Sequence, residues 1–386
     1  MERHHRDAVI VAAVRTPIGR RGGALSAWRP DEMAAFILRE LMERAEVSPG
    51  LVEDVLLGCA TPVGEQGYNV GRLAALMAGF PARVPAVTLN RMCASSDQAA
   101  QFASQAIRSG DRDVVIAAGV ESMSRVPMGS DGGKLSRLLR QRYDIVPQGI
   151  SAELMARRWK LSRAELDAYS LRSHERAVAA QRAENFRREL APIDVALASG
   201  ERLKLEQDEG PRPGTSLEQI AALPAVFQED GVVTAGNSSQ MSDGAAALLI
   251  MAREAAERLG LRPRARFVAH TTVGSDPTLQ LDGPVAATQA VLARARLPLA
   301  AMDHFEVNEA FASVVLAWAR EHHPDEAKLN PRGGGISLGH PLGATGARLL
   351  VTMLHALEDR GGRYGLQTMC IGHGMANATI IELEPA

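Results

Sequence analysis

The sequence of 386 residues has few cysteines, almost no net charge and no long apolar run. Its three cysteines, Cys59, Cys93 and Cys370, are too few, and odd in number, for a secreted disulfide framework. They predict a reducing compartment, and we expect a cytoplasmic protein. The 43 Lys and Arg residues nearly balance the 45 Asp and Glu residues, so the formal charge of −2 provides no bulk attraction to nucleic acid or to an anionic membrane.

The missing apolar runs exclude two further classes of protein. No segment approaches the roughly 20 apolar residues of a membrane-spanning helix, and residues 1–8 lack the apolar core of a signal peptide. We therefore expect a soluble protein without a membrane partner. The length is sufficient for two core-forming domains or for one large layered domain.

Strand-like and helix-like segments alternate along the chain, which is the pattern of an α/β fold. The expected core elements are a strand at 8–14, a helix at 30–45, a strand at 52–59, helices at 69–77 and 94–109, strands at 113–119 and 245–251, a helix at 252–259, a strand at 264–273 and a helix at 285–295. The near-continuous apolar run 113–119 predicts a parallel sheet covered on both faces. Between 122 and 242 strands fade and charges rise around helices at 151–159 and 163–185, which predicts an insertion over the core.

Cys93 lies where the extended apolar run 84–89 gives way to a helix-like run of small residues. The first turn of a helix offers unpaired N–H groups and the positive end of the helix dipole, which favour the reactive thiolate. A buried structural cysteine is the commoner role for a lone intracellular cysteine, and this stretch alone leaves the two roles about even. Cys59 has no His or Cys neighbour, so we expect it to serve in packing.

Three distant segments carry further groups that suit acyl chemistry. An amide lies in 308–311, an imidazole in 339–341 and a second thiol in 370–374, each beside glycines or a short turn. With Cys93 they form a set fit for acyl transfer through a thioester. Taken alone, His340 could equally be a surface loop histidine.

Together these segments make the sequence similar to the thiolase family, whose members cleave or form 3-ketoacyl-CoA. The resemblance runs from 9–19 to 380–382 and includes 119–124, 234–240, 243–247 and 339–344. It implies an α/β fold with two similar halves in a layered αβαβα arrangement and an inserted covering loop domain. The implied units are the N-terminal core half at 1–121, the loop domain at 122–243, a return to that half at 244–264 and the C-terminal core half at 265–386.

The resemblance also implies catalytic roles for five residues. Cys93 is then the acylated nucleophile, His340 the base that activates it, and Cys370 the acid or base at the methyl carbon of acetyl-CoA. Asn308 would hold a water that forms one oxyanion hole with His340. The second oxyanion hole would use the backbone N–H groups of Cys93 and Gly372.

For coenzyme A, the resemblance implies Ser239 on the pantetheine arm, with Ala310, Phe311 and Phe227 along the apolar part. Arg212 would lie near the nucleotide, where a basic group suits a phosphorylated ligand, although a solvated loop charge is an equal alternative. Coenzyme A enters as a substrate, and we expect no cofactor and no metal. The Cys-x-x-His spacing at 370–373 could form half of a metal site, but no second pair exists at matching spacing.

Four residues depart from the family pattern: Ser96, Asp97, Gln148 near the acyl group, and His373. Asp97 follows Cys93 by four residues, so we expect it on the same helical face, where its charge opposes the thiolate. These departures leave the acyl chain-length preference open.

The sequence therefore predicts a thiolase that cleaves 3-ketoacyl-CoA with free CoA through S-acyl-Cys93, in a reversible ping-pong reaction typical of fatty acid β-oxidation. A short-chain acetyl-CoA acetyltransferase restricted to acetoacetyl-CoA is one alternative. A non-catalytic scaffold that binds acyl-CoA is another. The resemblance also implies a homodimer or a homotetramer, with CoA and acyl-CoA thioesters as the ligands.

Overall fold

The computed structural model describes residues 4, 6–196 and 200–385. Within this part of the chain, one large sheet contains ten strands. Its order is β10-β11-β12-β9-β1-β8-β5-β3-β4, and β2 pairs with β8 beside this path. The strands are β1 Ala8–Arg15, β2 Gly19–Arg20, β3 Asp54–Gly58, β4 Ala86–Leu89, β5 Val114–Ser122, β8 Ser242–Ala252, β9 Ala265–Gly274, β10 His304–Val307, β11 Tyr364–Ile371 and β12 Met375–Leu383.

The sheet consists of two halves with a narrow junction. β1 joins β9 through only two residue pairs, Val9 with Arg266 and Ile10 with Ala265. Parallel pairing occurs between β3 and β4, β3 and β5, and β10 and β11, while the remaining neighbours are antiparallel. The expected parallel sheet is therefore only partly correct, because β5 runs parallel to β3 but antiparallel to β8. A continuous apolar run indicates that a strand is buried on both faces, and in this sheet antiparallel strands such as β8 are also buried on both faces.

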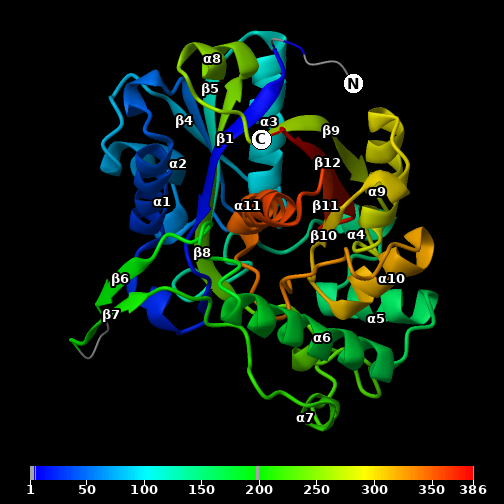
Figure 1. Cartoon of the computed structure of the whole chain (residues 1–386). Helices are drawn as coiled ribbons and strands as arrows, with labels where there is room; N and C mark the ends of the chain where they lie inside the picture. Colours follow the sequence, from blue (N-terminus) through cyan, green and yellow to red (C-terminus); the bar gives the residue numbers. More distant parts are fainter. Residues whose placement is uncertain (1–3, 5, 197–199, 386) are drawn as a thin grey trace.

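Alternating residues of β5 show how the layers form. Its even-numbered positions pack into a hydrophobic core shared with α1 and α2. Its odd-numbered positions 115 and 117 pack into a second core shared with α3 and α11. A third core joins the second half of the sheet to α9 and α10. The helices are α1 Pro30–Ala45, α2 Val70–Met77, α3 Ser95–Ser109, α8 Arg253–Arg258, α9 Gly283–Ala295, α10 Ala312–His322 and α11 Leu342–Arg360. α3 and α11 lie between the two sheet halves (Figure 1), which confirms the layered αβαβα arrangement.

A long segment between β5 and β8 lies at the lower end of the layers (Figure 1). It contains α4 Arg137–Arg142, α5 Gln148–Arg158, α6 Arg163–Arg182, β6 Ile193–Ala196, β7 Arg202–Leu205 and α7 Leu217–Ala221. The hairpin of β6 and β7 was not expected, because its four-residue strands carry more charge than a buried strand. The proposed unit boundaries at 121, 243 and 264 stay a prediction. Short 3-10 helices occur at η1 Ala24–Ala27, η2 Pro49–Leu51, η3 Gly64–Gln66, η4 Ala235–Asn237 and η5 Leu299–Ala301.

The first turns of α3 and α11 contact each other directly. The Ala347 N–H donates to Ser96 Oγ at 2.9 Å. A Cβ added at Gly346 would lie 2.3 Å from the Asp97 nitrogen, so glycine is needed for this approach. Because Cys93 precedes α3 and His340 precedes α11, the contact brings the two predicted reactive residues to the same region. Within the described ranges, no helix combines the length and the apolar character of a membrane span.

Candidate active site

A cavity of about 970 Å³ lies at the starts of α3 and α11. Its lining includes the three predicted reactive side chains of Cys93, His340 and Cys370. It also includes all six residues expected to bind CoA or the acyl group: Gln148, Arg212, Phe227, Ser239, Ala310 and Phe311. The structure therefore brings Cys93, His340 and Cys370 together although they are far apart in sequence. Asn308 and Gly372 are not among the lining residues, but Asn308 contacts His340 and the Gly372 N–H is directed at Cys93.

The nucleophile candidate lies in a tight turn between β4 and α3. Arg91 N–H donates to Ser95 Oγ at 2.9 Å, and this hydroxyl donates to the Met92 carbonyl at 2.6 Å. Met92 has a φ of 48°, a left-handed conformation that costs free energy in a residue with a side chain. The turn places Cys93 at the cavity wall with 6% of its surface exposed.

Burial raises the pKa of Cys93 to about 12. Hydrogen bonds from the backbone N–H groups of Cys93 and Gly372 lower this pKa, whereas the charge of Glu121 raises it further. The expected thiolate at the helix start is therefore wrong for the resting protein, because the desolvation of the sulfur outweighs the helix terminus. Ionisation of Cys93 requires a base.

Glu121 is a further functional candidate, which the sequence did not distinguish from the other residues of 119–124. It is the penultimate residue of the buried strand β5 and has no exposed surface. Its carboxylate accepts hydrogen bonds from the backbone N–H groups of Ala60, Thr61 and Gly343 and from Gln66 Nε2, at 2.7 to 3.2 Å. The signal in the sequence is an acid at the end of a fully apolar strand. Glu121 thus joins the loop after β3 to the first turn of α11.

Asp97 does not act on the nucleophile, contrary to our expectation. It accepts hydrogen bonds from Gln101 Nε2 at 3.0 Å, from Thr379 Oγ1 at 2.9 Å and from Gln367 Nε2. These partners lie on α3, β12 and β11, so the carboxylate faces the second half of the sheet. Burial raises the pKa of Asp97 to about 6. The acid whose charge acts on Cys93 is Glu121.

The hydrogen bonds of His340 define its basic nitrogen. Nδ1 lies 2.6 Å from Thr345 Oγ1, and that hydroxyl donates its proton to the Pro341 carbonyl at 2.8 Å. Nδ1 must therefore carry the imidazole proton, and Nε2 is the acceptor. Asn308 Nδ2 lies 3.3 Å from Nε2. Burial, together with the charge of Arg348, lowers the pKa of His340 to about 3, so the imidazole is neutral and able to accept a proton.

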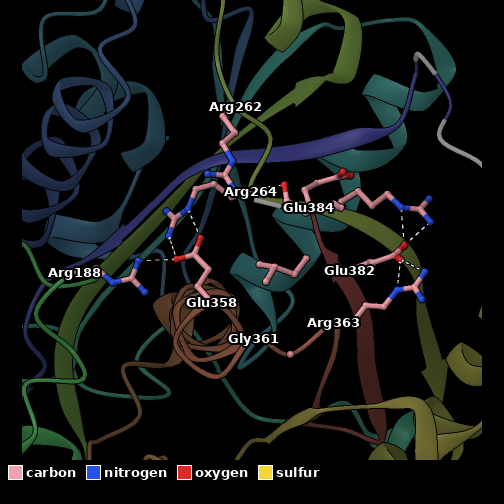
Figure 2. A pocket seen from close by; sticks show the side chains of 12 residues that line it. Arg188, Arg262, Arg264, Glu358, Gly361, Arg363, Glu382 and Glu384 are labelled. Carbon is pink, nitrogen blue, oxygen red and sulfur yellow. Dashed lines mark hydrogen bonds and ion pairs between the residues drawn. The ribbon is translucent and has the colours of Figure 1, made fainter.

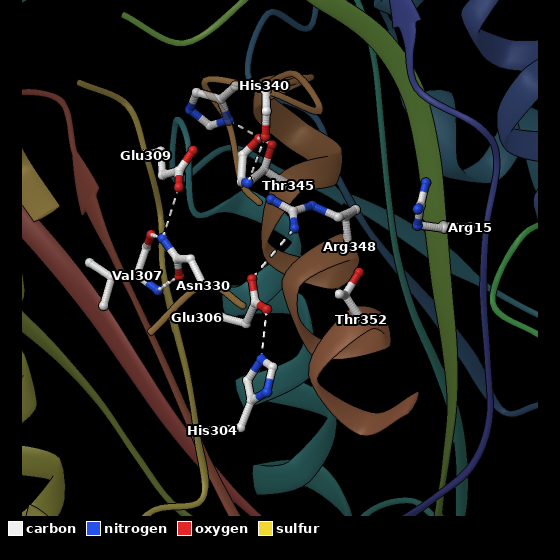
Figure 3. Close-up of polar contacts among 12 residues, drawn as sticks. Arg15, His304, Glu306, Val307, Glu309, Asn330, His340, Thr345, Arg348 and Thr352 are labelled. Atoms are coloured by element: carbon white, nitrogen blue, oxygen red, sulfur yellow. Dashed lines mark hydrogen bonds and ion pairs between the residues drawn. The ribbon is translucent and has the colours of Figure 1, made fainter. Parts of the chain in front are cut away.

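A buried charged cluster lies beneath this histidine (Figure 3). Arg348 lies one turn after Thr345 on α11, and its Nη1 is 3.5 Å from Glu306 Oε2. Glu306 Oε1 is 2.7 Å from His304 Nε2. Among the residues that the structure describes, no nitrogen of the Arg348 guanidinium has a hydrogen-bond partner. Arg348 is therefore a buried cation whose field reaches His340.

The segment after β10 is fixed by Glu309. Its carboxylate accepts from Tyr169 Oη and Ser173 Oγ, both at 2.7 Å, and from Ile336 N–H at 3.0 Å. The preceding Asn308 donates its backbone N–H to β11 and has a buried Oδ1 without a partner in the described part of the chain. Asn308 is thus held rigidly with one amide oxygen free.

Cys370 lies at the end of β11, is 1% exposed and contributes to the same cavity. Burial, with a smaller contribution from nearby Cys93, raises the pKa of the Cys370 thiol. His373 is exposed in the following turn, so the two residues of the Cys-x-x-His pair lie in different environments. Within the described ranges, no group of three or more His, Cys, Asp or Glu residues is placed to hold a metal ion. Cys59 packs in the core with α1 and α2, as expected.

The remainder of the cavity combines an apolar wall with basic groups. Phe227 and Phe311 stack edge to face with centroids 6.1 Å apart. The Ser239 N–H donates to the Ala310 carbonyl at 2.9 Å, which fixes that turn. Three arginines line the cavity: Arg20, Arg21 and Arg212. The first two were missed, because no motif distinguishes them from surface charges.

Comparison with known proteins gives matches over almost the whole chain. The family described as thiolase, N-terminal domain, matches residues 8–254, and thiolase, C-terminal domain, matches residues 261–383. The steroid 3-ketoacyl-CoA thiolase FadA6 of Mycobacterium tuberculosis is 46% identical over 97% of this chain and 94% of that protein. The beta-ketoadipyl-CoA thiolase of Pseudomonas aeruginosa is 45% identical over 98% of this chain and 99% of that protein. The solved structure of the Bacillus anthracis acetyl-CoA acetyltransferase superimposes with a TM-score of 0.91 and 36% identity, covering 98% and 99% of the two chains.

Proposed function

Because this chain belongs to the thiolase family of acyltransferases, we propose that it cleaves 3-ketoacyl-CoA with free CoA to acyl-CoA and acetyl-CoA, and that it also runs the reverse Claisen condensation. The observation that carries this proposal is the shared cavity of Cys93, His340 and Cys370. It supplies a nucleophile, a base and a second proton carrier within one enclosed space. The steps use only protein groups and CoA.

In the first half-reaction, Cys93 gives its thiol proton to Nε2 of His340, and its sulfur attacks the 3-keto carbon. The bond between C2 and C3 breaks, which leaves the acyl group on Cys93. The C2 carbanion takes a proton from the Cys370 thiol, and acetyl-CoA leaves. The hydrogen bonds that Cys93 and Gly372 direct at the sulfur support these N–H groups as donors to the oxygen of the tetrahedral intermediate.

In the second half-reaction, the thiol of free CoA gives its proton to the Cys370 thiolate and attacks the Cys93 thioester. Acyl-CoA leaves, and Cys93 recovers its proton from His340. Asn308 faces Nε2 of His340 and has a free Oδ1, which supports its role beside a bound water at the other oxyanion hole. The two half-reactions together make a ping-pong cycle.

For the CoA substrate, we assign the phosphates to Arg212, with Arg20 and Arg21 beside it in the same lining. The pantetheine arm then passes Ser239 and Ala310. The aromatic pair of Phe227 and Phe311 and the neutral Gln148 face the apolar part of the ligand. Neutral and apolar side chains around Cys93 suit an uncharged acyl chain.

Turnover across a series of 3-ketoacyl-CoA chain lengths tests this proposal. We expect thiolysis of acetoacetyl-CoA and of longer 3-ketoacyl-CoA substrates, with acetyl-CoA as the common product. Activity confined to acetoacetyl-CoA would instead identify a short-chain acetyltransferase. Tight binding of acyl-CoA without turnover of any member would identify a non-catalytic scaffold.

We also propose that the protein is a homo-oligomer, either a dimer or a tetramer, in the cytoplasm. β4 lies at the end of the strand order, so one of its edges is free for pairing with a second copy. Large exposed apolar side chains gather on β4 and α2: Leu73, Leu76, Met77 and Val87. All three cysteines are free and buried, which supports a reducing compartment. Sedimentation of the purified protein measures the oligomeric state.

A further inference from the structure

A second cavity, of about 870 Å³, lies far from the residues that line the first. It is formed by four separate segments: the start of β9, the C-terminal end of α11, the end of β12 and Arg188 of the long inserted segment (Figure 2). The two cavities share no lining residue in the described part of the chain. The proposed thiolase reaction gives this second cavity no role.

The second cavity is rich in arginine. Five arginines and three glutamates line it. They are Arg188, Arg262, Arg264, Arg266, Arg363, Glu358, Glu382 and Glu384. Guanidinium groups bind carboxylates and phosphates through paired N–H donors, and the five lining arginines outnumber the three lining glutamates. Arg188 and Arg266 also pair with Asp359 and Asp7, which lie outside the lining.

Two of the glutamates are each shared by two arginines. Glu358 accepts a paired interaction from Arg264, with both distances at 2.8 Å, and a third hydrogen bond from Arg188 at 2.9 Å. Glu382 accepts from Arg266 at 2.8 Å and from Arg363 at 2.7 Å. These carboxylates hold the guanidiniums in fixed positions without neutralising all of them.

Donors remain available after these pairs have formed. The Arg262 guanidinium contacts only the Pro385 carbonyl, at 3.4 Å, among the residues that the structure describes. Nη1 of Arg264 has no hydrogen-bond partner within the same ranges, and the Arg363 side chain, which pairs with Glu382 and stacks on Tyr364, is 63% exposed. None of these nitrogens is among the buried unpaired atoms, so they are open to a ligand.

The arrangement has two basic ends, and Glu384, whose carboxylate accepts from Arg253, lies between them. Figure 2 shows Arg188, Arg262 and Arg264 grouped on one side near Glu358, and Arg363 beside Glu382 on the other side. Gly361, Gly362, Leu383 and Pro385 also line the cavity and carry no side-chain charge. A ligand that satisfies both ends needs two anionic groups separated by an organic body.

We propose that this cavity binds a small organic molecule with an anionic group, phosphate or carboxylate, at each end. The volume lies within the range of about 300–1,000 Å³ that is usual for small-molecule sites. The prearranged guanidiniums reduce the ordering cost of binding. The site is independent of the CoA cavity, so its test does not depend on the proposed acyl transfer.

The experiment is calorimetric titration of the full-length protein with two probes, adipate and butane-1,4-diphosphonate. Each carries its two anionic groups at the ends of four methylenes, so their comparison identifies the preferred anion. Hexanoate and butylphosphonate are the controls with one anionic end. We expect at least one of the two-ended probes to bind more tightly than its one-ended counterpart.

Variants then locate the binding. Arg262→Ala and Arg363→Ala each remove one end, and the loss of a charge-assisted hydrogen bond should weaken binding by about ten- to a hundredfold. Arg258→Ala, at an exposed arginine of α8 outside both cavities, and Arg212→Ala, in the CoA cavity, should leave binding unchanged. Thermal unfolding of each variant reports its folding, and Arg262 forms no ion pair in the described structure, so its loss leaves no carboxylate unpaired.

Three results would overturn the proposal. One is the absence of binding by both two-ended probes at millimolar concentration. Another is equal weakening in Arg258→Ala, which would indicate nonspecific attraction to surface charge. The third is a loss of binding in Arg212→Ala with none in Arg262→Ala or Arg363→Ala, which would place the probe in the CoA cavity.

Discussion

Thr345 Oγ1 lies 2.6 Å from Nδ1 of His340 while it donates its own proton to the Pro341 carbonyl. This single contact fixes the tautomer of the histidine, because a hydroxyl whose proton is already engaged can only accept from Nδ1–H. Nε2 then faces Asn308 and the cavity as a proton acceptor. The base in the proposed reaction is thus defined by a threonine one turn into α11.

Replacement of Thr345 tests this relationship. Thr345→Val keeps the shape but removes the acceptor for Nδ1–H, and Thr345→Ser keeps the acceptor. A neutral hydrogen bond contributes about 0.5–1.5 kcal/mol, so kcat/KM for thiolysis should fall by up to about tenfold in the valine variant. The serine variant should remain near wild type. Equal rates in the two variants would mean that the hydroxyl does not orient His340.

Replacement of Arg348 tests whether its positive charge lowers the pKa of His340. Its positive charge helps to lower the pKa of His340, so Arg348→Met should raise that pKa. His340 would then be protonated at a higher pH, and the acidic limb of the kcat/KM profile should move to higher pH. Arg348→Lys keeps the charge and should keep the limb in place. A limb that stays fixed in the methionine variant would show that burial alone sets the pKa of His340.

Replacement of Glu121 tests the acid near the nucleophile. Its charge raises the pKa of Cys93, so Glu121→Gln should move the midpoint of iodoacetamide alkylation of Cys93 to lower pH. The variant should also lose about 1–3 kcal/mol of stability, because an amide NH₂ would face backbone donors. Alkylation at a series of pH values and urea unfolding measure the two effects. An upward shift of the midpoint would contradict the assignment.

Asp97 offers a test of stability rather than reactivity. Burial raises its pKa to about 6, above the unfolded value of about 3.9. The free energy that this raised pKa contributes to folding is therefore fully present below the unfolded pKa. It is lost as the pH rises through about 6. When the pH rises from acidic to neutral, the free energy of unfolding of Asp97→Asn should increase by about 2–3 kcal/mol relative to that of wild type.

Urea unfolding across this pH range measures the difference, with Asp111→Asn as an exposed control that should run parallel to wild type. Alkylation of Cys93 should keep its midpoint in Asp97→Asn, because the carboxylate faces Gln101, Gln367 and Thr379. If the stability curves of Asp97→Asn and wild type are parallel, the aspartate is not held in a raised-pKa environment.

The candidate reactive residues came from sequence chiefly through the resemblance of their motifs. An apolar run followed by small residues defined the turn at Cys93, but local patterns alone left Cys93 and His340 undecided between a reactive and an ordinary role. The orientation of Asp97 was not predictable in this way. Helical spacing shows which residues share a face, but the partner of that face is a tertiary fact, here the side chains from β11 and β12.

The strand directions in the sheet and the role of Glu121 were likewise not predictable from sequence, because both depend on tertiary contacts. An apolar run reports burial and does not distinguish parallel from antiparallel neighbours, so the sequence did not predict that β8 runs antiparallel to β5. Glu121 gains its partners from two segments that are distant in sequence, residues 60–66 and the first turn of α11. The paired arginines of the second cavity likewise come from segments that only the fold brings together.

The most direct test of the proposed mechanism is the site of acylation after incubation with acetyl-CoA, determined by peptide mass spectrometry. Wild type should carry an acetyl group on Cys93, and Cys93→Ala should carry none. Cys370→Ala should still be acetylated on Cys93 but should lack thiolysis turnover. An acetyl group on Cys370 in the Cys93→Ala protein, or the absence of any adduct on the folded wild type, would contradict the assignment of Cys93 as the nucleophile.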